Sequence, residues 1–232
     1  MSKGIQKIYR EVPRTYELVN HVLTLGFDMR WRKKAAKFAG AKGGAMWLDV
    51  CTGTGEMAVN LAELATGGTK VFGVDFSVPM VRVAAGKNGA SSILFSIADI
   101  QRLPFPDNTF DIITISFATR NINKNREFLT MCLREFRRVL RPGGHFVNLE
   151  TSQPKSHVLR MIFHLYIRLF VSRVGGRISG SESGYRYLSS TIPRFYGAGE
   201  FEDIIKEAGF ESTGYEPMTL GAAAIHAGVK PI

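Results

Sequence analysis

The sequence predicts an α/β protein in which a mostly parallel, seven-stranded sheet carries helices on both faces. Between residues 45 and 150, short apolar runs alternate with stretches of helical periodicity, which is the order of a parallel sheet joined by crossover helices. Five of these runs are expected to be strands, and two more strand candidates lie near the end of the chain: Ala45–Val50, Lys70–Asp75, Ser92–Ile97, Thr109–Ser116, His145–Glu150, Glu211–Pro217 and Leu220–Val229.

Helices are expected between these strands, at Glu56–Ala65, Val78–Gly86 and Arg126–Leu140, with a further helix near Glu200–Ala208. The tetrapeptide Arg141-Pro142-Gly143-Gly144 follows the third of them. Proline cannot continue a helix and glycine permits a sharp turn, so we expect this helix to stop there and a turn to lead into the fifth strand.

The length of 232 residues suits one well-buried domain, so residues 1–232 are expected to fold as a single unit. Two or three amphipathic helices over residues 3–39 predict an N-terminal helical cap, residues 1–40. An insertion after the fifth strand, residues 151–198, is expected to form a lid over the ligand site. It contains a strongly apolar stretch with interspersed arginines at 155–174.

The composition limits the class of protein. Apolar residues make up 45% and charged residues 22%, which are ordinary values for a soluble globular protein. No apolar run reaches the roughly 18–20 residues that span a bilayer, and the amino terminus lacks the apolar core of a secretory signal. A cytoplasmic location is therefore expected. The net charge of +10 favours an anionic partner: a nucleic acid, an acidic small molecule or the anionic face of a membrane.

Cysteine and histidine usage predicts neither disulfides nor a metal site. Cys51 and Cys132 are too few for a disulfide framework and lack metal-ligand spacing. The five histidines are scattered, with no HxH or HxxxH pair among them.

The most informative segment is Leu48–Glu56, LDVCTGTGE. It leaves a strand and enters a helix, so Gly53 and Gly55 lie where the backbone must approach a ligand closely. With Ala58 it satisfies GxGxxG/A, and Asp75 lies at the distance expected of a ribose-binding acid. This pattern alone serves NAD equally well, so a nicotinamide oxidoreductase stays an alternative.

Two further carboxylates favour S-adenosylmethionine over a dinucleotide. Asp49, at the end of its strand, would repel a pyrophosphate but suits a ligand with an ammonium and a sulfonium. Asp99 follows the third strand, where it can accept a hydrogen bond from the adenine amine while the backbone of residues 98–100 serves the ring. Asp75 would take both ribose hydroxyls. All three acids fall at carboxyl ends of strands, where ligands of such sheets bind.

Several segments resemble known methyltransferase motifs. LDVCTGTGE, VFGVDFS, LPFPDNTFD and LRPGG resemble motif I, motif II, the post-adenine segment and the turn before strand five of class I methyltransferases. LPFPDNTFDIITISFATRNINK, SGYRYLSSTI, AAAIHAG and the opening TYELVNHVLTLGFDMRWRK resemble, more narrowly, the ubiquinone/menaquinone C-methyltransferase family, the demethylmenaquinone methyltransferases. The resemblance covers nearly the whole chain. It implies a Rossmann-like class I fold and an S-adenosylmethionine-dependent methyltransferase that needs no metal.

Carried over by position, the resemblance implies cofactor contacts at Thr54, Asp75, Ala98, Asp99 and Ser116. Together with the residues argued above and two flanking positions, the expected cofactor site comprises Asp49, Gly53, Thr54, Gly55, Asp75, Phe76, Ala98, Asp99, Ile100 and Ser116. The chain departs from the family at CTGTG, where AGGTG or ACGTG is usual, at Ala118-Thr119, where a glycine and an aliphatic residue are usual, and at Ala227, where arginine is frequent. These departures leave the cofactor site intact and the exact acceptor open.

Arg120 and Asn121 follow the fourth strand at the ligand edge of the sheet. Methyl transfer to an aromatic carbon needs an electron-rich ring, so we expect this pair to hold the ring oxygen, with Arg120 stabilising the developing phenolate. Because arginine stays protonated, a water or His226 is the expected base. The alternatives are a structural salt bridge and loop cap for the pair, and a packed strand residue for His226. The acceptor pocket is expected to include Tyr16, Asn20, Tyr185, Arg186 and Tyr187.

The implied acceptor is the ring of a reduced prenylated quinone precursor, either demethylmenaquinol or a ubiquinone intermediate. Another small-molecule, lipid or RNA acceptor, or a non-catalytic protein that binds S-adenosylmethionine, are the alternatives. No RNA-binding module or aromatic RNP-type motif is visible, which argues against a nucleic-acid partner. Peripheral contact of residues 155–174 with the inner face of the membrane and a homodimer are left open.

Overall fold

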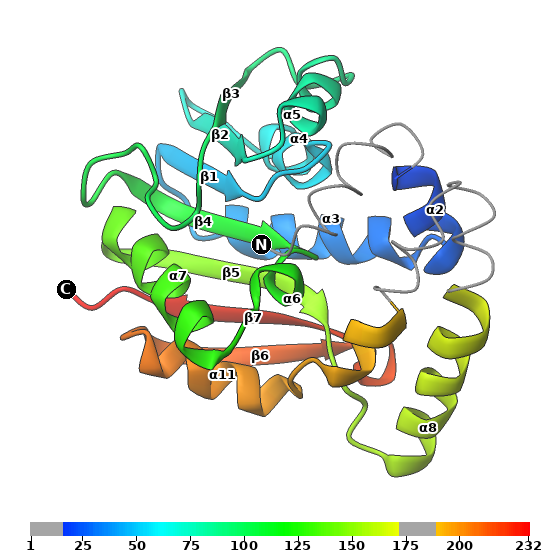
Figure 1. The fold of residues 1–232 in the computed structure, drawn as a ribbon. Helices are drawn as coiled ribbons and strands as arrows, with labels where there is room; N and C mark the ends of the chain where they lie inside the picture. Colours follow the sequence, from blue (N-terminus) through cyan, green and yellow to red (C-terminus); the bar gives the residue numbers. More distant parts are fainter. Residues whose placement is uncertain (1–15, 172–188) are drawn as a thin grey trace.

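The computed structural model describes residues 16–171 and 189–232 (Figure 1). One seven-stranded sheet runs through the molecule in the order β3-β2-β1-β4-β5-β7-β6. Neighbouring strands are parallel from β3 to β5, and β7 pairs antiparallel with both β5 and β6. This confirms the predicted mostly parallel sheet. The strands are β1 Met46–Val50, β2 Lys70–Asp75, β3 Ile93–Ile97, β4 Phe110–Ser116, β5 Leu140–Thr151, β6 Glu211–Met218 and β7 Ala223–Val229.

Helices cover both faces of the sheet. Alanines of α3 (Phe27–Gly40) and apolar residues of α4 (Glu56–Ala62) are buried with one face, while α7 (Arg126–Val139) and α11 (Ala198–Glu207) are buried with the other. The remaining elements are α2 Tyr16–Leu23, α5 Val78–Ala85, α6 Thr119–Ile122, α8 His157–Tyr166, the π-helical turn η1 Ile167–Val171 and the 3-10 turns η2 Ile192–Arg194 and η3 Thr219–Gly221.

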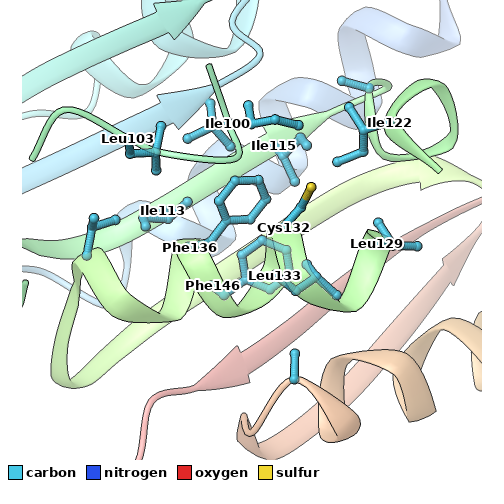
Figure 2. Packing of buried hydrophobic residues seen from close by; sticks show 14 of the residues in the cluster. Ile100, Leu103, Ile113, Ile115, Ile122, Leu129, Cys132, Leu133, Phe136 and Phe146 are labelled. Atoms are coloured by element: carbon cyan, nitrogen blue, oxygen red, sulfur yellow. The ribbon is translucent and has the colours of Figure 1, made fainter. Parts of the chain in front are cut away.

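Helix α7 shows why these elements hold together. Asn125 caps it, its side chain accepting a hydrogen bond of 2.8 Å from the backbone N–H of Phe128. Apolar residues at helical spacing, among them Leu129, Leu133 and Phe136, are fully buried with Phe146 of β5 and with Ile113 and Ile115 of β4 (Figure 2). Removing a buried phenylalanine side chain from such a core costs about 3–5 kcal/mol.

The expected turn at Arg141–Gly144 is wrong. Helix α7 does stop at Val139, but β5 begins at once and the tetrapeptide lies within that strand. Leu140 pairs with Phe110, and Gly143, at φ 75°, donates its N–H to the carbonyl of Lys230 over 2.9 Å. Strand pairing therefore extends β5 through residues that locally favour a turn.

The strand expected from Leu220 begins later, at Ala223. The preceding residues form η3, in which Thr219, Leu220 and Gly221 all have positive φ. Helices α2 and α3 agree with the predicted amphipathic helices, and α8 with η1 agrees with the apolar stretch as far as Val171. The division into a core, a cap and an insertion stays a prediction. No helix within residues 16–171 and 189–232 is long and apolar enough to cross a membrane.

Candidate active site

A pocket of about 510 Å³ opens at the carboxyl ends of β1, β2 and β4. It is called the cofactor pocket below. Its walls come from residues 51–54 of the loop after β1, from Glu56 and Met57 at the start of α4, from the residues after β2, and from residues 116–118 after β4. Since β1 pairs with β2 on one side and β4 on the other, the pocket lies where the strand order reverses. It brings together the predicted Gly53, Thr54, Asp75, Phe76 and Ser116.

The backbone of this pocket adopts rare conformations. Cys51, directly after β1, has φ 54°, and Phe117, directly after β4, has φ 51°. Non-glycine residues are uncommon there and cluster at binding sites. Gly53 has φ 55°, and a Cβ built on it meets no atom within 4 Å, so the loop leaves open space for a ligand. Gly55, in contrast, does not line the pocket: its Cβ would lie 2.9 Å from Ala84 Cβ, so close packing of α4 on α5 requires glycine.

Asp75 is held by the backbone of the two loops that meet at the pocket. Its Oδ2 accepts the N–H of Gly53 at 3.0 Å, and its Oδ1 accepts the N–H of Ser77 at 2.9 Å. Burial raises the pKa of this carboxyl group, against the lowering effect of these backbone donors. Each carboxylate oxygen has a further lone pair, so the arrangement suits a ligand with two neighbouring hydroxyl groups.

Asp49 lies beneath the loop instead of lining the pocket. Its carboxylate accepts the hydroxyls of Thr52 and Thr114, each at 2.7 Å, and its exposed fraction is 1%. Burial raises its pKa to about 7, although both threonines oppose the shift. The predicted direct contact with a ligand cation stays a prediction; the contacts seen are those that shape the loop.

The three residues expected at the adenine end do not line the cofactor pocket. Ala98 and Ile100 are buried and Asp99 is exposed, its carboxylate accepting the backbone and side-chain N–H groups of Gln101. They do lie on the same sheet edge, because Ile97 pairs with Asp75 and the N–H of Ala98 donates to the carbonyl of Asp75. Their contact with adenine stays a prediction.

A second pocket, of about 1430 Å³, adjoins the first, since Arg32 and Phe117 line both. It is called the acceptor pocket below. Apolar side chains of α2, α3, α8 and η1 form most of its wall, among them Leu23, Trp31 and Phe163. It suits a large apolar ligand whose polar end reaches the cofactor pocket.

Helix α6 stands between the two pockets, with Arg120 in the wall of the acceptor pocket and Asn121 in the wall of the cofactor pocket. The Arg120 guanidinium donates to Thr191 Oγ1 at 3.1 Å, and its Nε lies 3.9 Å from Oε1 of the fully buried Glu150. The backbone N–H of Arg120 donates to Glu150 Oε2 at 3.1 Å. Arg120 therefore pairs with Glu150 and also lines the acceptor pocket.

The family model of the ubiE/COQ5 methyltransferases matches residues 1–230. A demethylmenaquinone methyltransferase of Thermus thermophilus is 38% identical over 226 residues, which are 97% of this chain and 100% of that protein. A ubiquinone/menaquinone biosynthesis C-methyltransferase UbiE of Geobacter sulfurreducens is 35% identical over 230 residues, 97% of this chain and 88% of that protein. The chain belongs to the ubiE/COQ5 methyltransferase family.

The fold agrees with this membership. A crystal structure of an S-adenosylmethionine-dependent methyltransferase from Aquifex aeolicus superimposes with a TM-score of 0.61 at 20% identity, covering 86% of this chain and 89% of that one. The predicted Rossmann-like class I fold, the methyltransferase activity and S-adenosylmethionine as cofactor are thereby confirmed. The nicotinamide oxidoreductase is set aside.

The other predicted acceptor residues divide into two groups. Asn20 lines the acceptor pocket, and Tyr16 is the first residue of α2. The remaining three, Tyr185, Arg186 and Tyr187, lie outside the described residues.

His226 lies on β7 beneath α11 and lines none of the pockets described above. Its exposed fraction is 2%, its Nε2 is 2.9 Å from the carbonyl of Ala198, and its ring packs edge-on against Phe201. Burial lowers its pKa to about 4. The geometry is that of a packed strand residue, and its role as a base stays a prediction.

The sequence analysis missed the charged residues that α3 brings to both pockets. Arg32 lines both, and Asp28, one turn earlier, lines the acceptor pocket with an exposed fraction of 1%. Their i,i+4 spacing signals an ion pair, but nothing local indicates that it faces inward. Three groups with metal-ligand atoms, Glu17, His21 and Glu56, lie within 4.8 Å of one another near these residues. Each already has a polar partner: Glu17 pairs with Lys87, His21 is within hydrogen-bond distance of Asp28, and Glu56 pairs with Arg32.

Proposed function

We propose that the chain transfers the methyl group of S-adenosylmethionine to a ring carbon of a reduced prenylated quinone precursor, demethylmenaquinol or a ubiquinone intermediate. The apolar acceptor pocket carries this proposal, because it meets the cofactor pocket at Phe117 and Arg32 and has room for an aromatic ring with part of an isoprenoid tail. The names of the relatives, which refer to demethylmenaquinone and to ubiquinone and menaquinone biosynthesis, support the same acceptor class.

The bound cofactor supplies an electrophilic methyl group on a sulfonium. The protein then has to orient the ring carbon in line with that methyl group, exclude water and stabilise the phenolate oxygen. Arg120 lies in the wall of the acceptor pocket with a buried guanidinium, which suits a phenolate. Leu23, Trp31 and Phe163 provide the water-free surface on which the ring and tail are held.

An RNA acceptor is less well supported by this geometry. Bases and phosphates require stacking surfaces within a basic groove, whereas the acceptor pocket is lined mainly by aliphatic and aromatic side chains. Another apolar phenol remains the second candidate, since the same wall would accept it.

Methyl transfer from radiolabelled S-adenosylmethionine tests the proposal. The acceptors are a reduced demethylmenaquinone with a short prenyl tail, the same quinone in oxidised form, a phenol without a tail, and a tRNA pool. Label in the reduced prenylated quinone alone is expected. Label in the phenol at equal kcat/KM, or in tRNA, would overturn the acceptor, and label in none of them would overturn the proposed activity.

We also propose peripheral contact with an anionic membrane through α8. Val158, Met161 and Leu165 recur along one stripe of this helix, with exposed fractions of 59%, 55% and 55%. The helix lies at the edge of the molecule, below α2 in the view of Figure 1, and its residues Leu159 and Phe163 line the acceptor pocket. A quinone leaving the bilayer would thus meet the pocket at this surface.

The positive charge around α8 favours contact with an anionic membrane over contact with a second copy of the chain. No aspartate or glutamate occurs in residues 151–181, whereas Lys155, Arg160 and Arg168 fall within or beside α8 and η1. Anionic lipid headgroups complement this surface, while a symmetric dimer through α8 would bring like charges together. A homodimer through another surface stays a prediction.

Flotation with vesicles tests the contact. The wild type should float with vesicles containing phosphatidylglycerol and less with phosphatidylcholine alone. The triple variant Val158→Ser, Met161→Ser, Leu165→Ser should lose flotation. A matched triple, Val78→Ser, Met131→Ser and Leu94→Ser, removes the same residue types at exposed positions elsewhere and should retain flotation. Equal behaviour of the two triples would rule out α8 as the contact.

A further inference from the structure

Neither the motifs nor the proposed function has given Arg32 a chemical role. It comes from α3, in the predicted N-terminal cap, yet it lines both the cofactor pocket and the acceptor pocket with an exposed fraction of 5%. Among the described residues that line the cofactor pocket, it carries the only positive charge, beside the acids Glu56 and Asp75. A buried cation in a ligand pocket requires a functional explanation because its desolvation is costly.

Two carboxylates fix one end of the guanidinium. Nη1 of Arg32 lies 2.7 Å from Asp28 Oδ2 and 3.0 Å from Glu56 Oε2. Thr24 Oγ1 donates to the other oxygen of Asp28 at 2.7 Å, and His21 Nδ1 lies 2.7 Å from Asp28 Oδ2. The guanidinium also lies over the ring of Phe117, with 4.9 Å from Cζ to the ring centroid. These contacts orient Arg32 before any ligand binds.

The opposite edge of the guanidinium is left for a ligand. Nε and Nη2 of Arg32 make no hydrogen bond to any residue within 16–171 and 189–232. This edge binds a carboxylate through two parallel N–H bonds. The same edge of Arg126 does so elsewhere in the protein, where Nε and Nη2 both donate to the carboxylate of Glu207.

We propose that Arg32 binds the α-carboxylate of the amino-acid end of S-adenosylmethionine. The neighbouring Glu56 makes the pocket wall an adjacent positive and negative pair, which complements the carboxylate and ammonium of an amino acid. Because Asp75 lines the same pocket as Arg32 and Glu56, a ligand with its ribose at Asp75 has its amino-acid end in the cavity that this pair borders. The inference rests on the proposed cofactor pocket, and it assigns a role to the N-terminal cap in binding the cofactor.

The assignment also explains the position of Arg32 between the pockets. A bound cofactor would keep the guanidinium engaged on the side of the cofactor pocket, leaving Phe117 and the apolar wall to the acceptor. Without that ligand, a guanidinium with free donors borders an apolar pocket, which is unfavourable for an apolar acceptor.

Binding of three cofactor analogues, measured by isothermal titration calorimetry, tests the proposal. S-adenosylhomocysteine has the carboxylate and the ammonium, its decarboxylated analogue S-adenosyl-3-thiopropylamine has only the ammonium, and 5′-methylthioadenosine has neither. Arg32→Met should raise the Kd of S-adenosylhomocysteine about 10- to 100-fold, the range for a lost hydrogen-bonded charge pair. The other two ligands lack the carboxylate, so their Kd values should change less than about twofold, the small effect expected of losing a charge that they do not contact.

Lys33→Ala is the matched control, since it removes a positive charge from the exposed side of the same helix. It should leave all three Kd values unchanged. If Arg32→Met does not fold, Arg32→Lys keeps a cation between Asp28 and Glu56 and should show a smaller loss that is still confined to S-adenosylhomocysteine. Equal weakening of all three ligands, or of none, would overturn the role of Arg32. Failure of the wild type to bind any of them would instead overturn the cofactor pocket.

Discussion

Arg120 and Asn121 are consecutive residues of α6, yet their side chains line different pockets, Arg120 the acceptor pocket and Asn121 the cofactor pocket. Successive side chains on a helix point about 100° apart, so one short turn places a residue on each side of the boundary. Phe117, whose φ of 51° precedes this turn, lines both pockets. Methyl transfer across this boundary would take place next to α6.

Replacing Arg120 should separate catalysis from cofactor binding. Arg120→Met is expected to lower kcat/KM roughly 10²- to 10³-fold, the effect of removing one donor to a developing oxyanion. The Kd of S-adenosylhomocysteine should change less than about twofold, because that pocket is lined by Asn121 instead. Turnover assays and calorimetry on the same preparation measure both.

Loss of Arg120 leaves Glu150 buried without its ion-pair partner, which is destabilising. A melting curve is therefore needed for each variant, and Arg120→Lys provides one that retains the charge. Parallel loss of turnover and cofactor affinity, in a variant that melts like the wild type, would place Arg120 in the wrong pocket.

Replacing Asp75 should have the reverse effect. Asp75→Asn is expected to raise the Kd of S-adenosylhomocysteine about 10- to 100-fold through weaker bonds to the ribose hydroxyls. The amide also loses one of the acceptor oxygens used by Gly53 and Ser77, so the loop loosens. Asp203→Asn, at a largely exposed position on α11, is the control that should bind normally. Unchanged affinity in Asp75→Asn would remove its assignment to the ribose.

Much of the fold follows from the sequence because strand and helix periods are local. The strands that end at Val50, Asp75, Ile97 and Ser116 were predicted at those ends, since each is an apolar run that stops at a polar or glycine-containing loop. The start of β5 could not be predicted. Leu140 joins the strand because β4 lies beside it, which is a tertiary effect.

The candidate site was predictable only where a motif carries it. Gly53, Thr54 and Asp75 line the cofactor pocket because the glycine loop and the second strand end at one sheet edge. Arg32 belongs to α3, which reaches this edge because small residues such as Ala35 pack against the sheet. No local sequence pattern predicts that the helix lies there. The same holds for His226, whose burial under α11 depends on the pairing of β7 with β5.

Asp49 should make stability decrease as pH rises from about 4 to 7. Burial raises its pKa to about 7 in the native state, while an unfolded aspartate titrates near 3.9. The native state therefore binds more protons in this window. The contribution of Asp49 to the free energy of unfolding is complete below about pH 4 and is lost as pH rises through 7, with a total of about 4 kcal/mol.

Chemical denaturation of the wild type and Asp49→Asn at pH 4.5 to 8 measures this contribution. The free energy of unfolding of the variant should gain on that of the wild type as pH increases. Since all other groups are shared, their titrations cancel in the difference. Parallel curves across the whole range would show that Asp49 is ionised throughout.

The titration of His226 should make stability increase with pH, the opposite of the effect of Asp49, and His226 should have no role in turnover. Burial lowers its pKa to about 4, whereas an unfolded histidine titrates near 6.5. The stability that it contributes is present above about pH 6.5 and is lost as pH falls through 4, with a total of about 3 kcal/mol. His226→Gln removes this titration, so the free energy of unfolding of the variant should fall less on acidification than that of the wild type.

The same variant tests whether His226 is a base. Because Nε2 is engaged with Ala198 and the ring lies under α11, kcat at pH 8 should stay within about threefold of wild type, far less than the 10²- to 10⁴-fold effect of losing a general base. A larger loss of kcat, together with disappearance of the acidic limb of its pH profile, would make His226 the base after all.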